Sequence, residues 1–230
     1  IFNRQAAKKQ ASLNGRRDAE QEFGCNPCSE IILRPYQFCN LSEVVVRSSD
    51  TQQSLTEKVR LATILGTFQS TLTEFKYLRN VWKKNTMEER LLGVSLTGIM
   101  DNAMMSGKSA HLGMNISATL NALKEQAINT NAAMAEQLGI SQSAAITCVK
   151  PSGTVSQLVN SASGIHARHN PYYIRTVRGD NKDPITQFLI SEGIPAEPDV
   201  MKPDSTTVFS FPMKSPHSVV TRFDMSAIEQ

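Results

Sequence analysis

An amide, a thiol and a carboxylate occupy alternate positions of one short segment, at Asn26, Cys28 and Glu30. In extended backbone, side chains two positions apart point to the same side, so these three polar groups can converge on one spot. A second thiol, Cys39, follows eleven residues after Cys28. A segment that serves only to pack in a protein core does not need three polar groups on one side. The arrangement therefore predicts a reactive site.

The same segment also contains a Cys-x-x-Cys pair, Cys25 and Cys28, which invites a zinc or redox interpretation. A structural zinc site needs four ligands, and the sequence offers no second pair of cysteines or histidines at close spacing. Four cysteines in 230 residues also do not make a disulfide scaffold. We therefore expect no metal site and a reducing, cytoplasmic setting.

A second stretch combines small and hydroxylated residues between a predicted strand and a predicted helix: Pro151, Ser152, Gly153, Thr154, Val155 and Ser156. Free backbone N–H groups at the start of a helix favour an anion, so a phosphate fits here. Serine and threonine at a helix start also serve as ordinary caps. The Walker pattern GxxxxGK[ST] is absent. From this stretch alone, a phosphate site and a plain helix cap both stay open.

The elements that must position these groups alternate between short strands and longer helices. Runs of apolar residues predict strands at residues 41–47, 91–98, 144–149, 172–177 and 206–211. The strand at 91–98 is expected to pass into a helix at 99–105. This alternation predicts an α/β architecture with a largely parallel sheet or barrel, in one domain.

Helix boundaries can be predicted from capping patterns. Ser54 and Glu57 match a capping box ahead of a helix whose apolar stripe comprises Leu61, Leu65, Phe68, Leu72 and Phe75. Thr86 and Glu89 match a second box ahead of another short helix. A long helix from about residue 116 is expected to end at Gly139, and a third, starting at Asp183-Pro184, at Gly193. Residues 1–23 are predicted to form surface helix and loop.

Composition excludes several classes of protein. The chain is 40% hydrophobic and 20% charged, with a net charge of +3, as in an ordinary globular protein. It has no run of basic residues interleaved with aromatic ones, so we expect no nucleic-acid polymer as partner. No apolar run approaches the roughly 20 residues that span a bilayer, so we expect no membrane association. Both ends read as interior sequence, and residues 1–230 are expected to be part of one longer domain.

Taken together, the motifs resemble a known family. NPCSE, YQFCNLSEV and CVKPSGTVSQLVNSASGIHARHNPYYIRTVR are similar to segments of ribonucleotide reductases, and closest to the adenosylcobalamin-dependent class II enzymes in their monomeric ribonucleoside-triphosphate reductase branch. The resemblance runs from about residue 20 to the end of the chain. It implies an incomplete part of a ten-stranded α/β barrel, with the catalytic loop inside it.

The resemblance also implies a role for each motif residue. Cys28 matches the cysteine that becomes a thiyl radical and takes the 3′ hydrogen of the ribose. Glu30 matches the general base for the 3′-hydroxyl, and Asn26 the amide that binds the sugar hydroxyls. Cys39 matches one thiol of the pair that reduces the 2′ position. The stretch from Pro151 to Ser156 matches the loop that holds the substrate phosphates.

The implied activity is reduction of ribonucleoside triphosphates to 2′-deoxyribonucleoside triphosphates with adenosylcobalamin as cofactor. The implied partners are a deoxynucleotide effector and a thioredoxin-like reductant, and the implied full-length enzyme is a monomer. The sequence departs from the family pattern in two ways. Neither Cys25 nor Cys148 stands at the position of the partner thiol of Cys39, and the C-terminal cysteine pair is missing. This stretch alone is therefore expected to be inactive.

Two other hypotheses stay open. The chain could bind nucleotide phosphates without catalysis, with structural cysteines. It could also be a relative that uses diphosphates or a diiron centre as its radical source. His166 and His169 could contact phosphate, although a polar loop ahead of a strand explains them as well.

Overall fold

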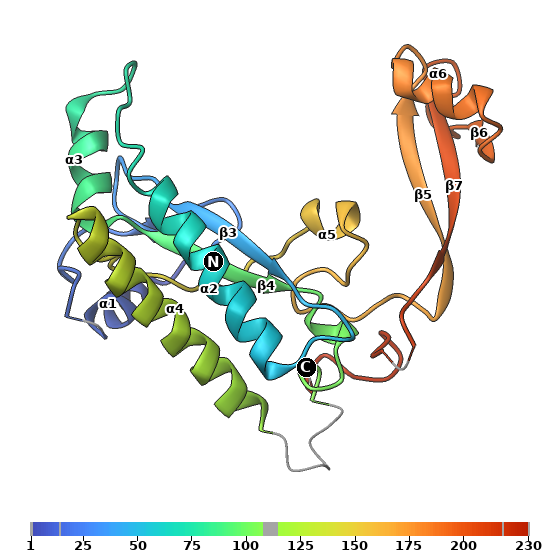
Figure 1. The fold of residues 1–230 in the computed structure, drawn as a ribbon. Coiled ribbons are helices and arrows are strands. Elements are labelled where there is room, and N and C mark those ends of the chain that lie inside the picture. The colour runs from blue at the N-terminus through green and yellow to red at the C-terminus, as the bar shows by residue number, and fades with distance from the viewer. Residues whose placement is uncertain (1, 14, 108–114, 218, 230) are drawn as a thin grey trace. The chain divides into compact units, whose positions relative to one another are not determined.

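A computed structural model describes residues 2–13, 15–107, 115–217 and 219–229, and the chain divides into two compact units, Ile1–Ala167 and Arg168–Gln230 (Figure 1). The first unit contains the parallel strands and most of the helices, and the second contains an antiparallel sheet. Helices and strands therefore mix as predicted, but the parallel strand pair lies in the first unit and the strands of the second unit pair antiparallel. The prediction of a single domain stays a prediction.

The centre of the first unit is a parallel strand pair, β3 (Asn40–Val45) and β4 (Leu92–Thr97). Helices α2 (Gln52–Gln69) and α4 (Ile116–Leu138) pack against each other along one side of this pair (Figure 1). Val44, Leu92 and Val94 point toward the helices and form the main apolar core with Leu55. Because side chains alternate along a strand, Leu41 and Gly93 point to the opposite face. That face carries the candidate site.

Helix α2 starts earlier than the sequence pattern predicted. Its N-cap is Thr51, whose hydroxyl accepts a hydrogen bond from the Ser54 backbone N–H at 3.3 Å, while the Ser54 hydroxyl accepts one from the Thr51 N–H at 3.0 Å. The box is therefore Thr51 with Ser54, and the predicted pairing of Ser54 with Glu57 is wrong. The reason is that a hydroxyl three residues further on can close a box as well as a carboxylate can.

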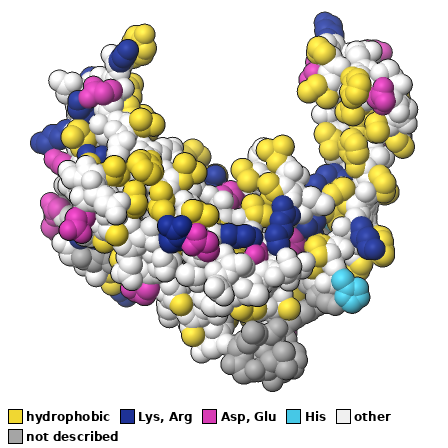
Figure 2. Space-filling model, viewed as in Figure 1, with side chains coloured by type: hydrophobic (Ala, Val, Ile, Leu, Met, Phe, Trp, Pro, Cys, Tyr) yellow, Lys and Arg dark blue, Asp and Glu magenta, His cyan; other side chains and the backbone are white. Residues whose placement is uncertain are grey.

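The apolar stripe predicted for α2 is present in the sequence but is not the buried face. The helix buries Leu55, Val59 and Thr63 instead, and it ends at Gln69, before Leu72 and Phe75. The predicted stripe residues Leu61, Leu65 and Phe68 are exposed instead. Figure 2 shows hydrophobic side chains at the surface of the molecule. Periodicity alone marks an apolar face without showing what covers it.

Helix α1 (Arg4–Ser12) and helix α3 (Asn80–Glu89) flank the strand pair, and the predicted surface helix near the N-terminus is confirmed. Thr86 and Glu89 lie at the end of α3 rather than at the start of a helix, so their prediction as a capping box is wrong. Both are buried. Glu89 is instead the acceptor for the buried Arg17 guanidinium, at 2.9 and 3.1 Å.

The end of β4 and the segment beside it are less regular than predicted. The expected helix at 99–105 is a single 3-10 turn, η1 (Ile99–Asp101), which follows Gly98 at φ 79°. The expected strand at 144–149 contributes only an isolated parallel bridge between Val94 and Thr147. Its backbone still aligns with β4, because the Cys148 N–H donates to the Val94 carbonyl at 3.0 Å. Helix α4 ends at Gly139 in the left-handed conformation, as predicted.

Three antiparallel strands form the sheet of the second unit, β5 (Tyr172–Asp180), β7 (Thr206–Lys214) and β6 (Ala196–Pro198), in the order β5-β7-β6. Helix α6 (Pro184–Ser191) connects β5 to β6 and is capped by Asp183, with proline at its first position. The strands at 172–177 and 206–211 and this helix are therefore confirmed. No helix in the part of the chain that the structure describes is long and apolar enough to cross a membrane.

Candidate functional site

The segment around Cys28 is a tight loop closed by two short antiparallel strands, β1 (Gly24–Cys25) and β2 (Ile32–Leu33). Asn26 fastens the loop twice to Ile31. Its side-chain oxygen accepts the Ile31 N–H at 3.0 Å, and its own N–H donates to the Ile31 carbonyl at 3.3 Å. Ser29 closes the turn in the left-handed region, at φ 64°. The loop thus fixes the backbone on both sides of Cys28.

A cavity of about 180 Å³ joins this loop to the second motif. Its walls contain Cys28 and Glu30 from the loop, and Lys150, Pro151 and His166 from the later segment. Cys28 is exposed, so its sulfur is accessible at the cavity. Pockets that enclose a whole ligand measure about 300–1,000 Å³, so this cavity fits one part of a nucleotide rather than all of it.

Glu30 has an unused carboxylate oxygen in this environment. Its Oε2 atom is buried and makes no hydrogen bond within the described residues. A buried oxygen without a partner is costly, and where such groups persist they often serve chemistry. Glu30 therefore presents a carboxylate that can accept a proton from a ligand in the same cavity as Cys28.

Cys39 lies behind the cavity rather than on its wall. It packs half-buried against an apolar cluster built on Ile31 and Leu91, and Cys148 packs against the same cluster. Burial, and next the negative charge of Glu30, raise the pKa of the Cys39 thiol and raise that of Cys148 to about 12. The positive charge of Lys150 lowers the pKa of both thiols. Both sulfurs therefore stay protonated at neutral pH.

Gly93 permits the close packing beneath the cavity. A Cβ atom at this position would collide with the Leu41 side chain and would lie 3.1 Å from Ile31 Cδ1 and 3.2 Å from Cys148 Sγ. The cluster under the loop thus depends on a residue without a side chain.

The predicted phosphate-binding stretch forms a compact turn with a single helical turn after it, α5 (Val155–Leu158). Gly153, Thr154 and Val155 are exposed, whereas Ser152 and Ser156 are buried. The Ser156 hydroxyl donates to the Ser152 carbonyl at 2.6 Å, so it holds the turn together and does not face a ligand. Backbone N–H groups and the Thr154 hydroxyl remain as the exposed donors of this stretch.

A second loop supports the turn from behind. The Ser163 hydroxyl donates to the carbonyls of Pro151 and Ser152 at 2.8 and 2.9 Å. The Gly164 N–H donates to Thr97 Oγ1 at 2.9 Å, which ties the loop to the end of β4. Thr97 in turn donates to the Ala162 carbonyl at 3.1 Å. The later motif is therefore positioned by β4 as well as by its own turn.

We expect Gly164→Ala to damage the site through its backbone. Gly164 adopts φ 54°, and an added Cβ would lie 2.8 Å from the Lys150 carbonyl and 3.0 Å from that of Pro151. The left-handed conformation alone costs a residue with a side chain about 1–2 kcal/mol, and the contact with backbone atoms adds to this cost. Urea unfolding should show the loss. Gly153→Ala, where a Cβ would meet nothing within 4 Å, is the matched control, and equal stability of the two variants would contradict the account.

The structure places at this face two polar residues that the sequence pattern did not assign, Lys150 and Glu43, and also His166, for which a phosphate contact had stayed open. Lys150 and His166 line the cavity, although 120 residues separate Glu30 from Lys150 in the chain. Glu43 has both carboxylate oxygens buried without a hydrogen bond in the described part of the chain, and it is the register partner of Ser95. Lys150 directly precedes Pro151, and that adjacency was the one available signal. No group of three or more potential metal ligands occurs among the described residues.

Comparison with known proteins gives a consistent result. No protein-family model matches the chain. Curated adenosylcobalamin-dependent ribonucleoside-triphosphate reductases from Lactobacillus acidophilus, Levilactobacillus brevis and Euglena gracilis are 30%, 29% and 27% identical, over 85%, 90% and 95% of this chain. The chain spans only 28–30% of the length of these relatives.

A solved structure supports the same relation at the level of the fold. The crystal structure of a B12-dependent class II ribonucleotide reductase aligns with a TM-score of 0.68 and 24% identity, over 86% of this chain and 30% of that one. The sequence comparison and the structure comparison thus point to the same group of proteins over most of the chain. The chain is similar in sequence to the adenosylcobalamin-dependent ribonucleoside-triphosphate reductases and matches a segment of less than a third of their length.

Proposed function

We propose that this chain supplies the radical-bearing loop of a ribonucleoside-triphosphate reductase, an oxidoreductase that makes 2′-deoxyribonucleoside triphosphates. The observation that carries the proposal is the cavity that Cys28 and Glu30 share with Pro151, the first residue of the phosphate loop. A thiol, a carboxylate and an anion-binding turn are what this reaction requires around one ribose. The similarity to curated triphosphate reductases supports the same substrate class.

In the proposed reaction Cys28, as a thiyl radical, takes the 3′ hydrogen atom of the ribose, which forms an S–H bond and leaves the radical on the sugar. Glu30 accepts the proton of the 3′-hydroxyl through its unpaired oxygen. Such a step requires one sulfur held close to one C–H bond, and the Asn26–Ile31 hydrogen bonds hold the loop for it. Because the Asn26 oxygen is occupied by Ile31, its side-chain N–H₂ group is the part that binds the sugar hydroxyls.

Cys39 serves the two-electron reduction at the 2′ position in this proposal. With a partner thiol it forms a disulfide and releases two electrons and two protons. One proton leaves with the 2′-hydroxyl as water, and the other hydrogen replaces that hydroxyl on the sugar. Glu30 then returns its proton to the 3′ oxygen, and Cys28 returns the 3′ hydrogen atom and is again a radical. A raised pKa suits Cys39, because the thiol must carry the proton that it gives.

The segment from Pro151 to Ser156 would hold the substrate phosphates through exposed backbone N–H groups around Gly153 and the hydroxyl of Thr154. The network of Ser156, Ser163 and Gly164 stabilises that turn. Phosphate oxygens accept hydrogen bonds only, so a turn that presents donors suits them.

The cofactor implied by the relatives is adenosylcobalamin. It would supply the radical that converts the Cys28 thiol to a thiyl. The residues fit this role, because Pro27, Cys28 and Ser29 are all exposed and form a surface that a large cofactor can approach. The remaining features of the proposal are a ten-stranded barrel of which residues 1–230 form part, a deoxynucleotide effector, a thioredoxin-like reductant, a monomeric state and a cytoplasmic setting.

The proposal predicts which additions the complete natural polypeptide needs for activity. Ribonucleoside triphosphate, adenosylcobalamin and a dithiol together should give deoxynucleotide, as measured by chromatography of the dephosphorylated products. Conversion should stop without the cofactor. Conversion of diphosphates only, or activity with iron in place of the cofactor, would favour the diphosphate or diiron alternative. Nucleotide binding without any conversion would favour a non-catalytic nucleotide-binding protein.

A further inference from the structure

Two basic side chains line the Cys28–Glu30 cavity without a role in the chemistry above. They are Lys150, which directly precedes the phosphate loop, and His166, which follows the supporting loop. Both segments belong to the first unit. A cavity of about 180 Å³ thus has two nitrogen bases on one part of its wall and a thiol with a carboxylate on the other.

Lys150 makes no hydrogen bond or ion pair within the described residues, and in particular none with Glu30 across the same cavity. The backbone of Lys150 packs closely against the supporting loop, because its carbonyl would lie 2.8 Å from a Cβ added at Gly164. An ammonium and a carboxylate that face one small space without contact leave room for a ligand between them. The charge of Lys150 also reaches the thiols behind the cavity, since it lowers the pKa of Cys39 and Cys148.

His166 is held in one orientation by its own turn. Its backbone N–H donates to the Ser163 carbonyl at 2.8 Å, and its Nδ1 atom lies 2.9 Å from the same oxygen. A carbonyl can only accept, so Nδ1 carries the hydrogen of that bond. The Nε2 atom is then the one that can serve a ligand. When it is protonated, it is a second cationic donor at the cavity.

We infer that Lys150 and His166 form a cationic subsite that binds the substrate phosphate nearest the sugar. This inference rests on the proposed function and adds two positioning residues to it. Lys150 balances the single carboxylate of Glu30, and a protonated His166 adds a further positive charge, so an anion is the favoured ligand of this wall. We assign the phosphate nearest the sugar because Lys150 lies between the two parts of the site. It directly precedes the phosphate loop at Pro151, and it lines the same cavity as Cys28.

The charge of the subsite can be measured on this chain without turnover. Cys28 is exposed in the cavity, so its alkylation by iodoacetate, an anion, can be compared with that by neutral iodoacetamide, using peptide mass spectrometry. The ratio of the two rates cancels the thiolate fraction of Cys28. We expect Lys150→Met to lower this ratio about fivefold, as befits the loss of one nearby charge, and Lys150→Arg to preserve it.

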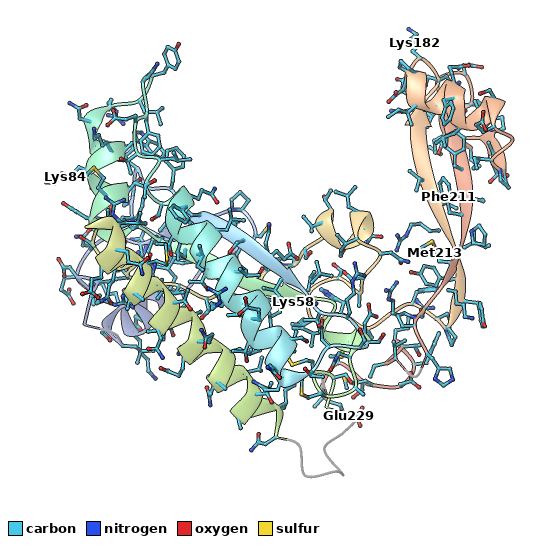
Figure 3. All side chains as sticks on the ribbon, in the orientation of Figure 1. Lys58, Lys84, Lys182, Phe211, Met213 and Glu229 are labelled. Carbon is cyan, nitrogen blue, oxygen red and sulfur yellow. The ribbon has the colours of Figure 1, made fainter. Side chains whose placement is uncertain are left out.

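His166→Asn should change the ratio in a pH-dependent way. In the parent chain the ratio of the two rates should be higher at pH 6 than at pH 8, and the variant should lose that difference. Glu30 and Lys150 are the other charged groups that line the cavity. The matched control is Lys84→Met. Lys84 lies on α3, in the same unit but away from α5 (Figure 3), so this substitution should leave the ratio of alkylation rates unchanged.

Protection of Cys28 from alkylation by a nucleotide tests whether the subsite binds the phosphate nearest the sugar. A nucleoside 5′-monophosphate should protect Cys28 from alkylation, and Lys150→Met should raise the concentration needed about tenfold, whereas the nucleoside without phosphate should protect equally in both chains. If neither Lys150→Met nor His166→Asn changes the ratio of alkylation rates, the inference is overturned, even if nucleotides protect Cys28. If the two substitutions change the ratio of alkylation rates but no nucleotide protects Cys28, the cavity is cationic but does not bind the substrate phosphate. That result would overturn the phosphate assignment and contradict the proposed function.

Discussion

Replacing Cys28 by serine should abolish deoxynucleotide formation by the complete natural polypeptide, with a loss beyond the detection limit. A serine hydroxyl holds its hydrogen more strongly than a thiol does and cannot serve as the radical carrier. The side chains are nearly the same size and Cys28 is exposed, so the fold should be unaffected. Deoxynucleotide is measured by chromatography, and the fold by circular dichroism.

Cys25→Ser provides the matched control for this experiment. Cys25 lies three residues earlier in the same loop, does not line the cavity and makes only a weak contact, at 3.6 Å, with the Ser29 hydroxyl. Its replacement should retain most of the activity. Deoxynucleotide formation by the Cys28→Ser protein would refute the assignment of the radical carrier, and equal losses in both variants would point to loop structure instead.

Replacing Glu89 by alanine should cause the largest loss of stability among the changes considered. Glu89 accepts hydrogen bonds from Arg17 at 2.9 and 3.1 Å and from Gln37 at 2.6 Å, and Arg34 lies 3.8 Å away. The side chains of Arg17, Arg34 and Glu89 are only 5–7% exposed. Arg34 keeps its ion pair with Glu88 at 2.8 Å, but removing the Glu89 carboxylate leaves the buried Arg17 guanidinium without its ion-pair partner, which costs about 3–5 kcal/mol.

Unfolding in urea, followed by fluorescence of Trp82, measures this loss in the first unit. Trp82 is the only tryptophan of the chain and lies on α3, the helix that ends at Glu89. The control is Glu20→Ala, which removes an ion pair with Lys8 whose side chains are 44% and 84% exposed, and exposed pairs contribute less than about 1 kcal/mol. A Glu89→Ala protein as stable as the Glu20→Ala protein would contradict the view that this cluster anchors α3.

The sequence predicted the local features that depend on few residues. Helix α4 and its end at Gly139 followed from an apolar repeat and a glycine in the left-handed conformation. Helix α6 followed from Asp183 and Pro184, which form a cap and a first turn. The chemical groups Asn26, Cys28 and Glu30 were visible for the same reason, because they lie within one short loop.

The features that were missed depend on contacts between distant segments. The apolar stripe of α2 is exposed because the strand pair contacts the other side, at Leu55 and Val59, and no periodicity reveals which face a neighbour will cover. Lys150 lines the same cavity as Glu30 only through the path of the chain, which passes along β4 and turns at Gly164. The network of Arg17 with Glu89 joins residues 72 positions apart. Charge patterns within a window cannot find such pairs.

The central claim is that Cys28 carries the radical, and electron paramagnetic resonance tests it most directly. The complete natural polypeptide, mixed with adenosylcobalamin, a ribonucleoside triphosphate and a deoxynucleotide effector and then frozen rapidly, should show cob(II)alamin coupled to a thiyl radical. Cys28→Ala should remove the coupled signal, whereas Cys25→Ala should keep it. A coupled signal that survives in the Cys28→Ala protein, or its absence from the parent protein under these conditions, would contradict the account.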